Sequence, residues 1–339
     1  MNYFAPWLVA GAVLNFSFQA SASDWSPREH KVRKISFWKG FQQKSLESKV
    51  FKAPTEIIDY ITQDNIAHGW PNRPLAVELS PEYQRDFIDA IKEMPDFIKT
   101  MINAKTVGVF VVSDLGGTGY TESVYDEETG KPVAAFVVLD AGVLNRSANE
   151  WGTWKESSPF QTNNQTRLTM LIEDAANDTR KNAIQYILLH EFGHVVSVGR
   201  PEVPLFGLLI SEMGPIEKYK FTKASWKIQD DSFASLFDDR FPERTQIRYY
   251  GHGESLGVEK AWHVYEELEQ TNFSTLYGAT NPFDDFAESF VSYVHAVVLK
   301  KPWQIQIRRS TGETLYFRSC WNTFRCHDKQ KTLETILGL

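Results

Sequence analysis

The stretch HEFGH, residues 190–194, contains the residue types and spacing of a hydrolytic zinc site. His190 and His194 are four positions apart, so on a helix both imidazoles lie on one face and can reach one ion. Glu191 lies about 100° further round the helix, where its carboxylate can reach a metal-bound water without ligating the metal. Zinc lowers the pKa of such a water, so Glu191 can take its proton and pass it to a leaving amine. The predicted cofactor is Zn²⁺.

A catalytic zinc also needs a third protein ligand and an open coordination position. The chain after His194 runs VVSVGRPEV, so no histidine follows at the short spacing HExxHxxGxxH, and a metzincin is excluded. The third ligand must therefore come from further along the chain. The candidates are His252, His263, Glu266, Glu267, Asp284, Asp285 and Glu288.

The segment YGATNPFDDFAESF, residues 277–290, contains three further candidate site residues. Together with HEFGH it resembles the zinc peptidases related to the anthrax lethal factor catalytic domain and the Pro-Pro endopeptidases, within the thermolysin-like Glu-zincin group. In that family a tyrosine precedes the third ligand by seven residues, and an acid in F-A-E-x-F follows it by four. The corresponding residues here are Tyr277, Asp284 and Glu288. The resemblance covers these two motifs and implies that Tyr277 donates its hydroxyl to the oxyanion.

The ligand position departs from the family, because it holds an aspartate rather than a glutamate. Asp284 is shorter by one methylene, so its helix must lie closer to the zinc. Glu288 is the alternative ligand, and in that case Asp284 would be the N3 acid of a capping box after Asn281. We favour Asp284, because Glu288 then stands one turn further on and can brace a ligand histidine from behind.

Two further roles have more than one candidate. The other candidates for the hydrogen-bond donor to the oxyanion are Tyr249, Tyr250, His252 and His263. If one of these has that role, Tyr277 is an aromatic residue in a loop without a catalytic function. In zincins an edge strand pairs with the extended substrate, and residues 134–142 are the candidate strand. The alternative is a buried central strand, since the run AAFVVL is continuously apolar.

Composition and charge narrow the class of partner. The 339 residues are 42% hydrophobic and 14% aromatic, which is sufficient for a packed core. The net charge is −7 and no Lys/Arg run is present, which argues against nucleic acid and against an anionic membrane surface. The predicted partner is a protein or peptide substrate, and the sequence leaves the oligomeric state open.

Residues 1–22 are predicted to be a signal peptide. They contain no charged side chain, an apolar stretch at 5–18 and then ASA, which fits cleavage before Ser23. The apolar stretch is too short for a comfortable bilayer span, so no stable membrane span is expected after cleavage. A tethered N-terminal helix is the alternative, because the first residues lack Lys and Arg. The prediction is export, to the periplasm or out of the cell.

Cys320 and Cys326 are the two cysteines of the chain. In an oxidising compartment they predict one short disulfide loop, and two free thiols are the alternative. Five residues separate them, so the CxxCH pattern of c-type haem attachment is excluded.

The surrounding elements place the metal motif on a helix. Helical spacing with start and stop signals covers 53–64, 80–103 with a break at Pro95, 177–199, 257–272 and 281–301. Strand patterns cover 106–114, a hairpin within 119–140 whose turn is 126–131, and 166–174. Strands followed by the motif helix predict an α+β class.

The expected fold is zincin-like, with a small twisted β-sheet packed on the active-site helix and a helical C-terminal lobe. The expected division is an N-terminal arm with helices at 23–105, followed by a two-lobed catalytic domain at 106–339 with an insertion at about 200–260. The predicted function is an exported zinc metalloendopeptidase, with His190, His194 and Asp284 as ligands and Glu191 as general base. The alternative is a catalytically inactive zincin-like binding or structural protein.

Overall fold

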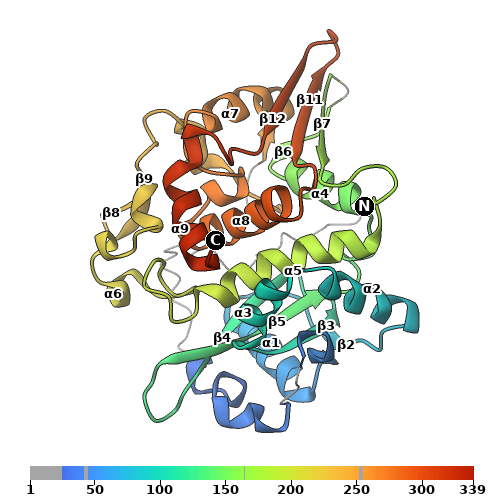
Figure 1. Cartoon of the computed structure of the whole chain (residues 1–339), viewed down its shortest axis with the longest axis vertical. Coiled ribbons are helices and arrows are strands. Elements are labelled where there is room, and N and C mark those ends of the chain that lie inside the picture. The colour runs from blue at the N-terminus through green and yellow to red at the C-terminus, as the bar shows by residue number, and fades with distance from the viewer. Residues whose placement is uncertain (1–24, 42–44, 164, 252–254) are drawn as a thin grey trace. The chain divides into compact units, whose positions relative to one another are not determined.

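The computed structural model describes residues 25–41, 45–163, 165–251 and 255–339 (Figure 1). The predicted signal peptide and the candidate ligand His252 lie outside these residues. The chain forms two compact units, of which one ends at Asn145 and the other extends from Arg146 to Leu339. The domain boundary expected at residue 106 falls inside the first unit, and each unit is described below by itself.

The first unit contains a mixed five-stranded sheet in the order β1-β3-β5-β4, with β2 paired to β3. Its elements are β1 (Val50–Lys52), α1 (Thr55–Ala67), β2 (Leu75–Ala76), α2 (Pro81–Lys92), α3 (Asp96–Asn103), β3 (Thr106–Ser113), β4 (Gly119–Tyr125) and β5 (Pro132–Asp140). The predicted hairpin is present as antiparallel β4 and β5. In its turn the Asp126 N–H donates to the Lys131 carbonyl at 2.9 Å, and Gly130 has φ +66°.

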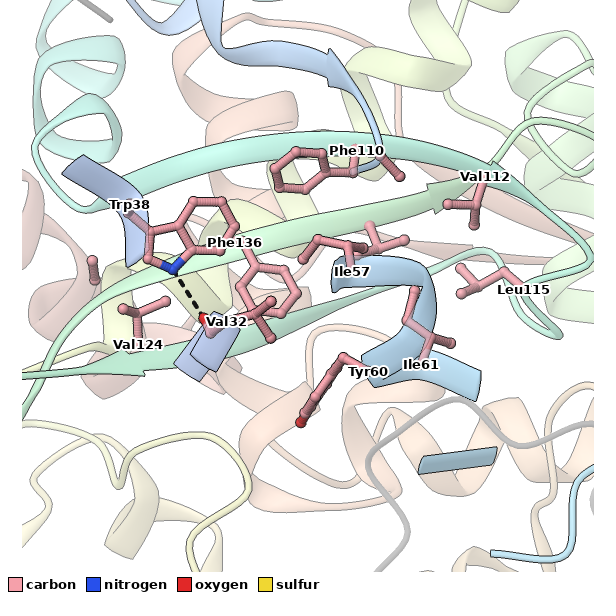
Figure 2. Close-up of a cluster of buried hydrophobic side chains, with 13 residues drawn as sticks. Val32, Trp38, Ile57, Tyr60, Ile61, Phe110, Val112, Leu115, Val124 and Phe136 are labelled. Atoms are coloured by element: carbon pink, nitrogen blue, oxygen red, sulfur yellow. Dashed lines mark hydrogen bonds between the residues drawn. The ribbon is translucent and has the colours of Figure 1, made fainter. Parts of the chain in front are cut away.

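Aromatic side chains form the core of this unit on one face of the sheet (Figure 2). Phe110 of β3 and Phe136 of β5 are fully buried. The Trp38 ring lies 5.7 Å from the first and 5.5 Å from the second, and its indole N–H donates to the Val32 carbonyl at 2.9 Å. Ile57 of α1 packs into the same cluster, so the apolar face of this helix covers the sheet.

Strand β5 is a central strand, and the prediction that residues 134–142 form a substrate-binding edge was wrong. One side of β5 pairs with β3 in parallel and the other pairs with β4 antiparallel, so its backbone groups are already used. Side chains at 135–139 are fully buried on both faces of the sheet. The continuous apolar run reflects this two-sided burial, which an edge strand does not require.

The second unit is mainly helical and carries the HEFGH motif. Its elements include α4 (Ala148–Ser157), β6 (Phe160–Gln161), β7 (Thr166–Leu171), α5 (Arg180–Ser197), α6 (Ile210–Met213), β8 (Trp226–Gln229), β9 (Ser232–Ser235), β10 (Leu256–Gly257), α7 (Ala261–Leu268), α8 (Pro282–Tyr293), β11 (Gln304–Arg309), β12 (Thr314–Arg318) and α9 (His327–Leu337). Strand β11 lies between β7 and β12, antiparallel to both. Helix α4 packs on β7, and α5 packs on both α4 and α8.

Helices make up 45% and strands 19% of the structure, which is consistent with the predicted α+β class. The predicted disulfide between Cys320 and Cys326 is confirmed, with the two Cα atoms 5.6 Å apart. Within the described ranges, none of the helices has the length and apolar character needed to cross a membrane.

Candidate metal centre

Helix α5 holds the HEFGH motif inside the second unit. Thr179 caps its start by accepting a hydrogen bond from the Asn182 N–H at 3.4 Å, and Gly199 with φ +69° lies just beyond its end. Both signals are where the sequence predicts them. The helix is buried along most of its length, including His194 with 4% of its surface exposed. Packing on several sides therefore fixes the histidine side chains before any metal binds.

Gly193 allows α8 to approach α5 closely. A Cβ built at Gly193 would lie 2.7 Å from the Ala287 Cα and 3.2 Å from its Cβ, closer than packed atoms tolerate. The glycine therefore brings the backbone of α8, with Asp284 and Glu288, up to the two histidines.

Gly193→Ala is expected to destabilise the protein by about 1–3 kcal/mol, the usual cost of overpacking. The obstructing atoms belong to a helix backbone and cannot move aside as a flexible side chain would. Urea unfolding of the variant and of Gly40→Ala measures the effect, since a Cβ at Gly40 meets no atom within 4 Å. Equal stability of the two variants would contradict the close approach of the helices.

Three side-chain atoms converge at the interface of α5 and α8. Asp284 Oδ1 lies 3.4 Å from His194 Nε2 and 3.7 Å from His190 Nε2. Ligands about 2.1 Å from a tetrahedral zinc are about 3.4 Å from one another, so these spacings fit one zinc ion. The set of two imidazoles and a carboxylate is also the type of donor set that zinc takes in hydrolases.

Asn281 prepares Asp284 for this position. Its side-chain oxygen caps α8 by accepting the N–H groups of Phe283 and Asp284 at 3.0 and 2.9 Å. Its side-chain amide donates to Asp284 Oδ2 at 2.6 Å, which leaves Oδ1 to face the histidines. Asp284 is thus at the N3 position of a capped helix, but its carboxylate is turned to the side-chain amide of Asn281 and to the histidine pair.

Glu288 lies behind His190, on the ring side away from Asp284. Its Oε1 is 2.9 Å from His190 Nδ1, at hydrogen-bonding distance, and 3.0 Å from Lys155 Nζ. A carboxylate on Nδ1 favours the tautomer with its proton there, which frees Nε2 for a metal. Burial lowers the pKa of His190, but Glu288 together with Glu191 and Asp284 outweighs burial, and the net shift of the pKa is upward. A histidine binds a metal only through a deprotonated nitrogen, so protons and the metal compete for His190.

Lys155 of α4 anchors Glu288 in a buried charge network that the sequence did not predict. Its Nζ also lies 3.1 Å from Glu156 Oε1, and Glu156 Oε2 accepts the hydroxyls of Tyr249 and Tyr265 at 2.9 and 2.8 Å. Burial opposes the charge of Lys155, yet the two carboxylates hold its pKa above the ordinary value. Nothing in the sequence distinguishes Lys155 and Glu156 from surface charges on a short helix.

Tyr277 lies beside the three converging atoms, in the turn Tyr277–Ala279. Its ring is 5.8 Å from the His190 ring, and Lys155 Nζ lies 4.7 Å from its centroid. Burial and then the charge of Asp284 raise the pKa of Tyr277 well above its ordinary value, so the hydroxyl keeps its proton. Glu191 is 4% exposed, and its negative charge contributes to the upward pKa shifts of both His190 and Tyr277.

The rival tyrosines have other contacts. The Tyr249 hydroxyl donates to Glu156, and its ring packs 4.7 Å from that of Tyr277. Tyr250, with φ +57°, packs 6.1 Å from Tyr277 and donates its N–H to Ser158 Oγ. Of the two, Tyr250 is the less buried and remains a second candidate beside the site.

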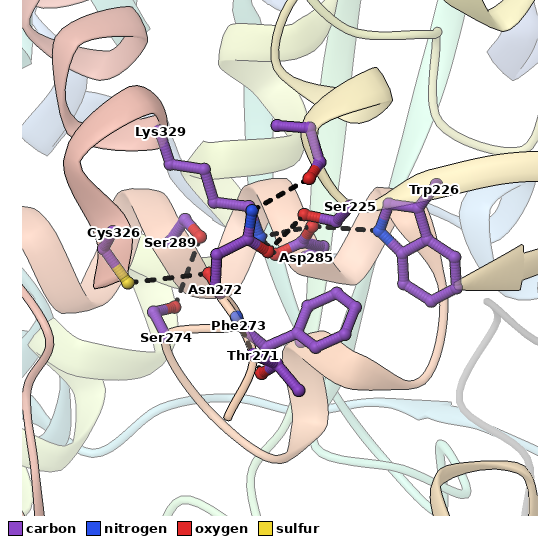
Figure 3. Close-up of polar contacts among 12 residues, drawn as sticks. Ser225, Trp226, Thr271, Asn272, Phe273, Ser274, Asp285, Ser289, Cys326 and Lys329 are labelled. Carbon is purple, nitrogen blue, oxygen red and sulfur yellow. Dashed lines mark hydrogen bonds and ion pairs between the residues drawn. The ribbon is translucent and has the colours of Figure 1, made fainter. Parts of the chain in front are cut away.

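The other candidate ligands lie elsewhere. Asp285 is fully buried against Lys329 at 2.6 Å and accepts the Trp226 indole N–H at 2.9 Å (Figure 3). This buried ion pair links α8 to α9, so Asp285 has a structural role. Glu266 accepts the Trp262 indole N–H, while His263 and Glu267 contact each other on α7.

Comparison with known protein families, curated proteins and solved structures finds no match to this chain.

Proposed function

We propose that this chain is a zinc-dependent metallopeptidase with a zincin-like catalytic unit. The observation that carries the proposal is the convergence of His190 Nε2, His194 Nε2 and Asp284 Oδ1. Glu191 directly follows His190 on α5, the helix that carries both histidines. A purely structural metal site has no use for an acid placed next to a ligand histidine, whereas hydrolysis requires one.

His190, His194 and Asp284 would hold the zinc, which when bound supplies a Lewis acid and lowers the pKa of a water. Glu191 removes a proton from the attacking water and delivers it to the leaving amine. Tyr277 is protonated and donates its hydroxyl to the oxyanion of the tetrahedral intermediate. Glu288 and Lys155 are positioning residues, because they act on the substrate only through His190.

Zinc content and peptide hydrolysis test the proposal together. Purified full-length protein is expected to hold at least one equivalent of zinc and to cleave members of an untargeted peptide library. A chelator should stop cleavage and added zinc should restore it. Protein that binds no zinc, even after its addition, would show that the peptidase assignment is wrong. The cleavage profile also identifies the substrate class, which the site does not specify.

Asp284→Ala is expected to lose one equivalent of zinc, because two histidines alone do not hold the ion. Glu288→Ala should keep the zinc with an affinity reduced about 10–100-fold, the usual loss when a residue bracing a ligand is removed. Competition with a chelator of known affinity measures both. The reverse order would make Glu288 the third ligand, with Asp284 as part of the helix cap.

Export is part of the same proposal. The uncharged apolar segment at residues 1–22 and the disulfide between Cys320 and Cys326 both fit an oxidising compartment outside the cytoplasm. N-terminal sequencing of protein from the periplasm or medium tests it, with Ser23 expected as the first residue.

A further inference from the structure

A second group of candidate metal-binding side chains lies apart from the histidine pair of α5, partly in the segment 200–260, whose role the sequence did not reveal, and partly on the helix that follows it. Glu243 lies in the turn Pro242–Gln246, while His263 and Glu267 lie on α7. Each contributes one donor atom, and these three atoms lie within 4.8 Å of one another. We propose that Glu243, His263 and Glu267 form a second divalent-metal site that binds zinc.

The two carboxylates point to a missing positive charge. Oε2 of Glu243 and Oε2 of Glu267 are shielded from solvent, and neither accepts a hydrogen bond from an N–H or hydroxyl of the described residues. Two adjacent carboxylates cannot both ionise without a counter-charge, which is a shared proton, a protonated His263 or a bound cation.

The position of His263 favours a cation. A proton shared by two carboxylates needs no third group, yet His263 stands one helical turn before Glu267 on the same face of α7. His263 Nε2 lies 3.0 Å from Glu267 Oε1, so nitrogen and oxygen donors meet at one point. An imidazole with two carboxylates suits zinc better than calcium, which takes oxygen ligands. The His263 side chain is 62% exposed, which leaves the ion a path from solvent.

A metal bound at this site would cross-link the turn at 242–246 to α7. From the same turn the Arg244 guanidinium donates to the Ala279 carbonyl at 3.1 Å, in the turn that carries Tyr277. The chain then continues to Tyr249, whose ring packs on Tyr277. A metal at this place would hold together two segments that border the first site.

The test uses the full chain with Asp284→Ala, so that only the second site remains. After equilibration with zinc and removal of free metal, this variant is expected to retain one equivalent and to melt at a higher temperature than its chelator-treated form. Adding Glu267→Gln should remove both the zinc and the thermal shift. The chelator-treated Glu267→Gln variant should be no less stable than its parent, because an amide can donate to Glu243.

Glu266→Gln in the same background is the matched control, since Glu266 is the neighbouring acid on α7 and accepts the Trp262 indole N–H. It should keep the zinc. If Asp284→Ala protein holds no zinc, or if adding Glu267→Gln does not lower the amount of zinc that it holds, the second site is refuted and the counter-charge is a proton. If Asp284 is not a ligand of the first site, Asp284→Ala protein holds one more equivalent, but Glu267→Gln still removes one, so the two assignments fail independently.

Discussion

Glu191→Gln is expected to reduce peptide hydrolysis by about 10²–10⁴-fold while the zinc stays bound, because general acid–base catalysis contributes a factor of this size. The amide keeps the shape and burial of the side chain but cannot take a proton from water. Glu191 is not one of the three converging donors, so its replacement leaves the ligand set intact. Initial rates on a peptide cleaved by the wild type, with zinc content measured on the same samples, give the result.

Glu217→Gln is a suitable control, because Glu217 is an exposed glutamate in the same unit. It should leave both zinc content and rate unchanged. If Glu191→Gln hydrolyses the peptide at the wild-type rate, Glu191 is not the general base. If the wild type holds zinc but cleaves none of the peptides tested over a range of pH values, the alternative of a catalytically inactive zincin-like binding protein is favoured instead.

Lys155→Met is expected to cost about 3–5 kcal/mol of unfolding free energy, the typical effect of removing one partner from a buried ion pair. Lys155 is 2% exposed and Glu288 is 1% exposed, so neither charge reaches water. Without the ammonium group, two buried carboxylates lose their shared counter-charge. Urea unfolding of chelator-treated protein at pH 7 measures this, with the exposed Lys227→Met as control, expected within about 0.5 kcal/mol of wild type.

The pH dependence of this effect follows from Glu288. Burial raises its pKa, but Lys155 and His190 together outweigh burial and lower the pKa from 4.5 to about 2. A lowered folded-state pKa stabilises the protein above pH 4.5, and this contribution is lost as the pH falls toward 2. In Lys155→Met the pKa of Glu288 rises, so protonation relieves the unpaired charge.

The stability difference between wild type and Lys155→Met should therefore narrow between pH 7 and pH 4. Adding Glu288→Gln should likewise recover part of the loss at pH 7, since it removes one of the two uncompensated charges. A difference that is the same at both pH values would show that lost packing, not charge, is responsible.

The sequence was most informative where the signal is local. The start and stop of α5, the break at Pro95 between α2 and α3, the β4–β5 turn and the start of α8 at Asn281 are all where the sequence predicts them. Each depends on the backbone preferences of one or two residues, such as a capping side chain or a proline without an N–H. The disulfide pairing followed because the chain has two cysteines.

Which side chains are buried was less predictable from the sequence, because burial depends on which other elements pack against each face of a strand or helix. The apolar run at 134–139 is compatible with an edge strand or a central strand. Only the pairing of β5 with both β3 and β4 shows that it is a central strand. Lys155 and Glu156 belong to a short helix with no apolar stripe that would mark a buried face. Their burial comes from the packing of α4 between β7 and α5.

For the candidate site, spacing along one helix was enough to bring His190 and His194 together, since the helical repeat holds wherever the helix lies. The choice between Asp284 and Glu288 could not be made in this way, because both acids lie on α8 and either can face α5. The contact of Gly193 with Ala287 sets the distance between the helices, and the amide of Asn281 turns Asp284 toward the two Nε2 atoms. Glu288 is held on the opposite ring nitrogen of His190 by Lys155, a residue distant in sequence that only the packed chain brings there.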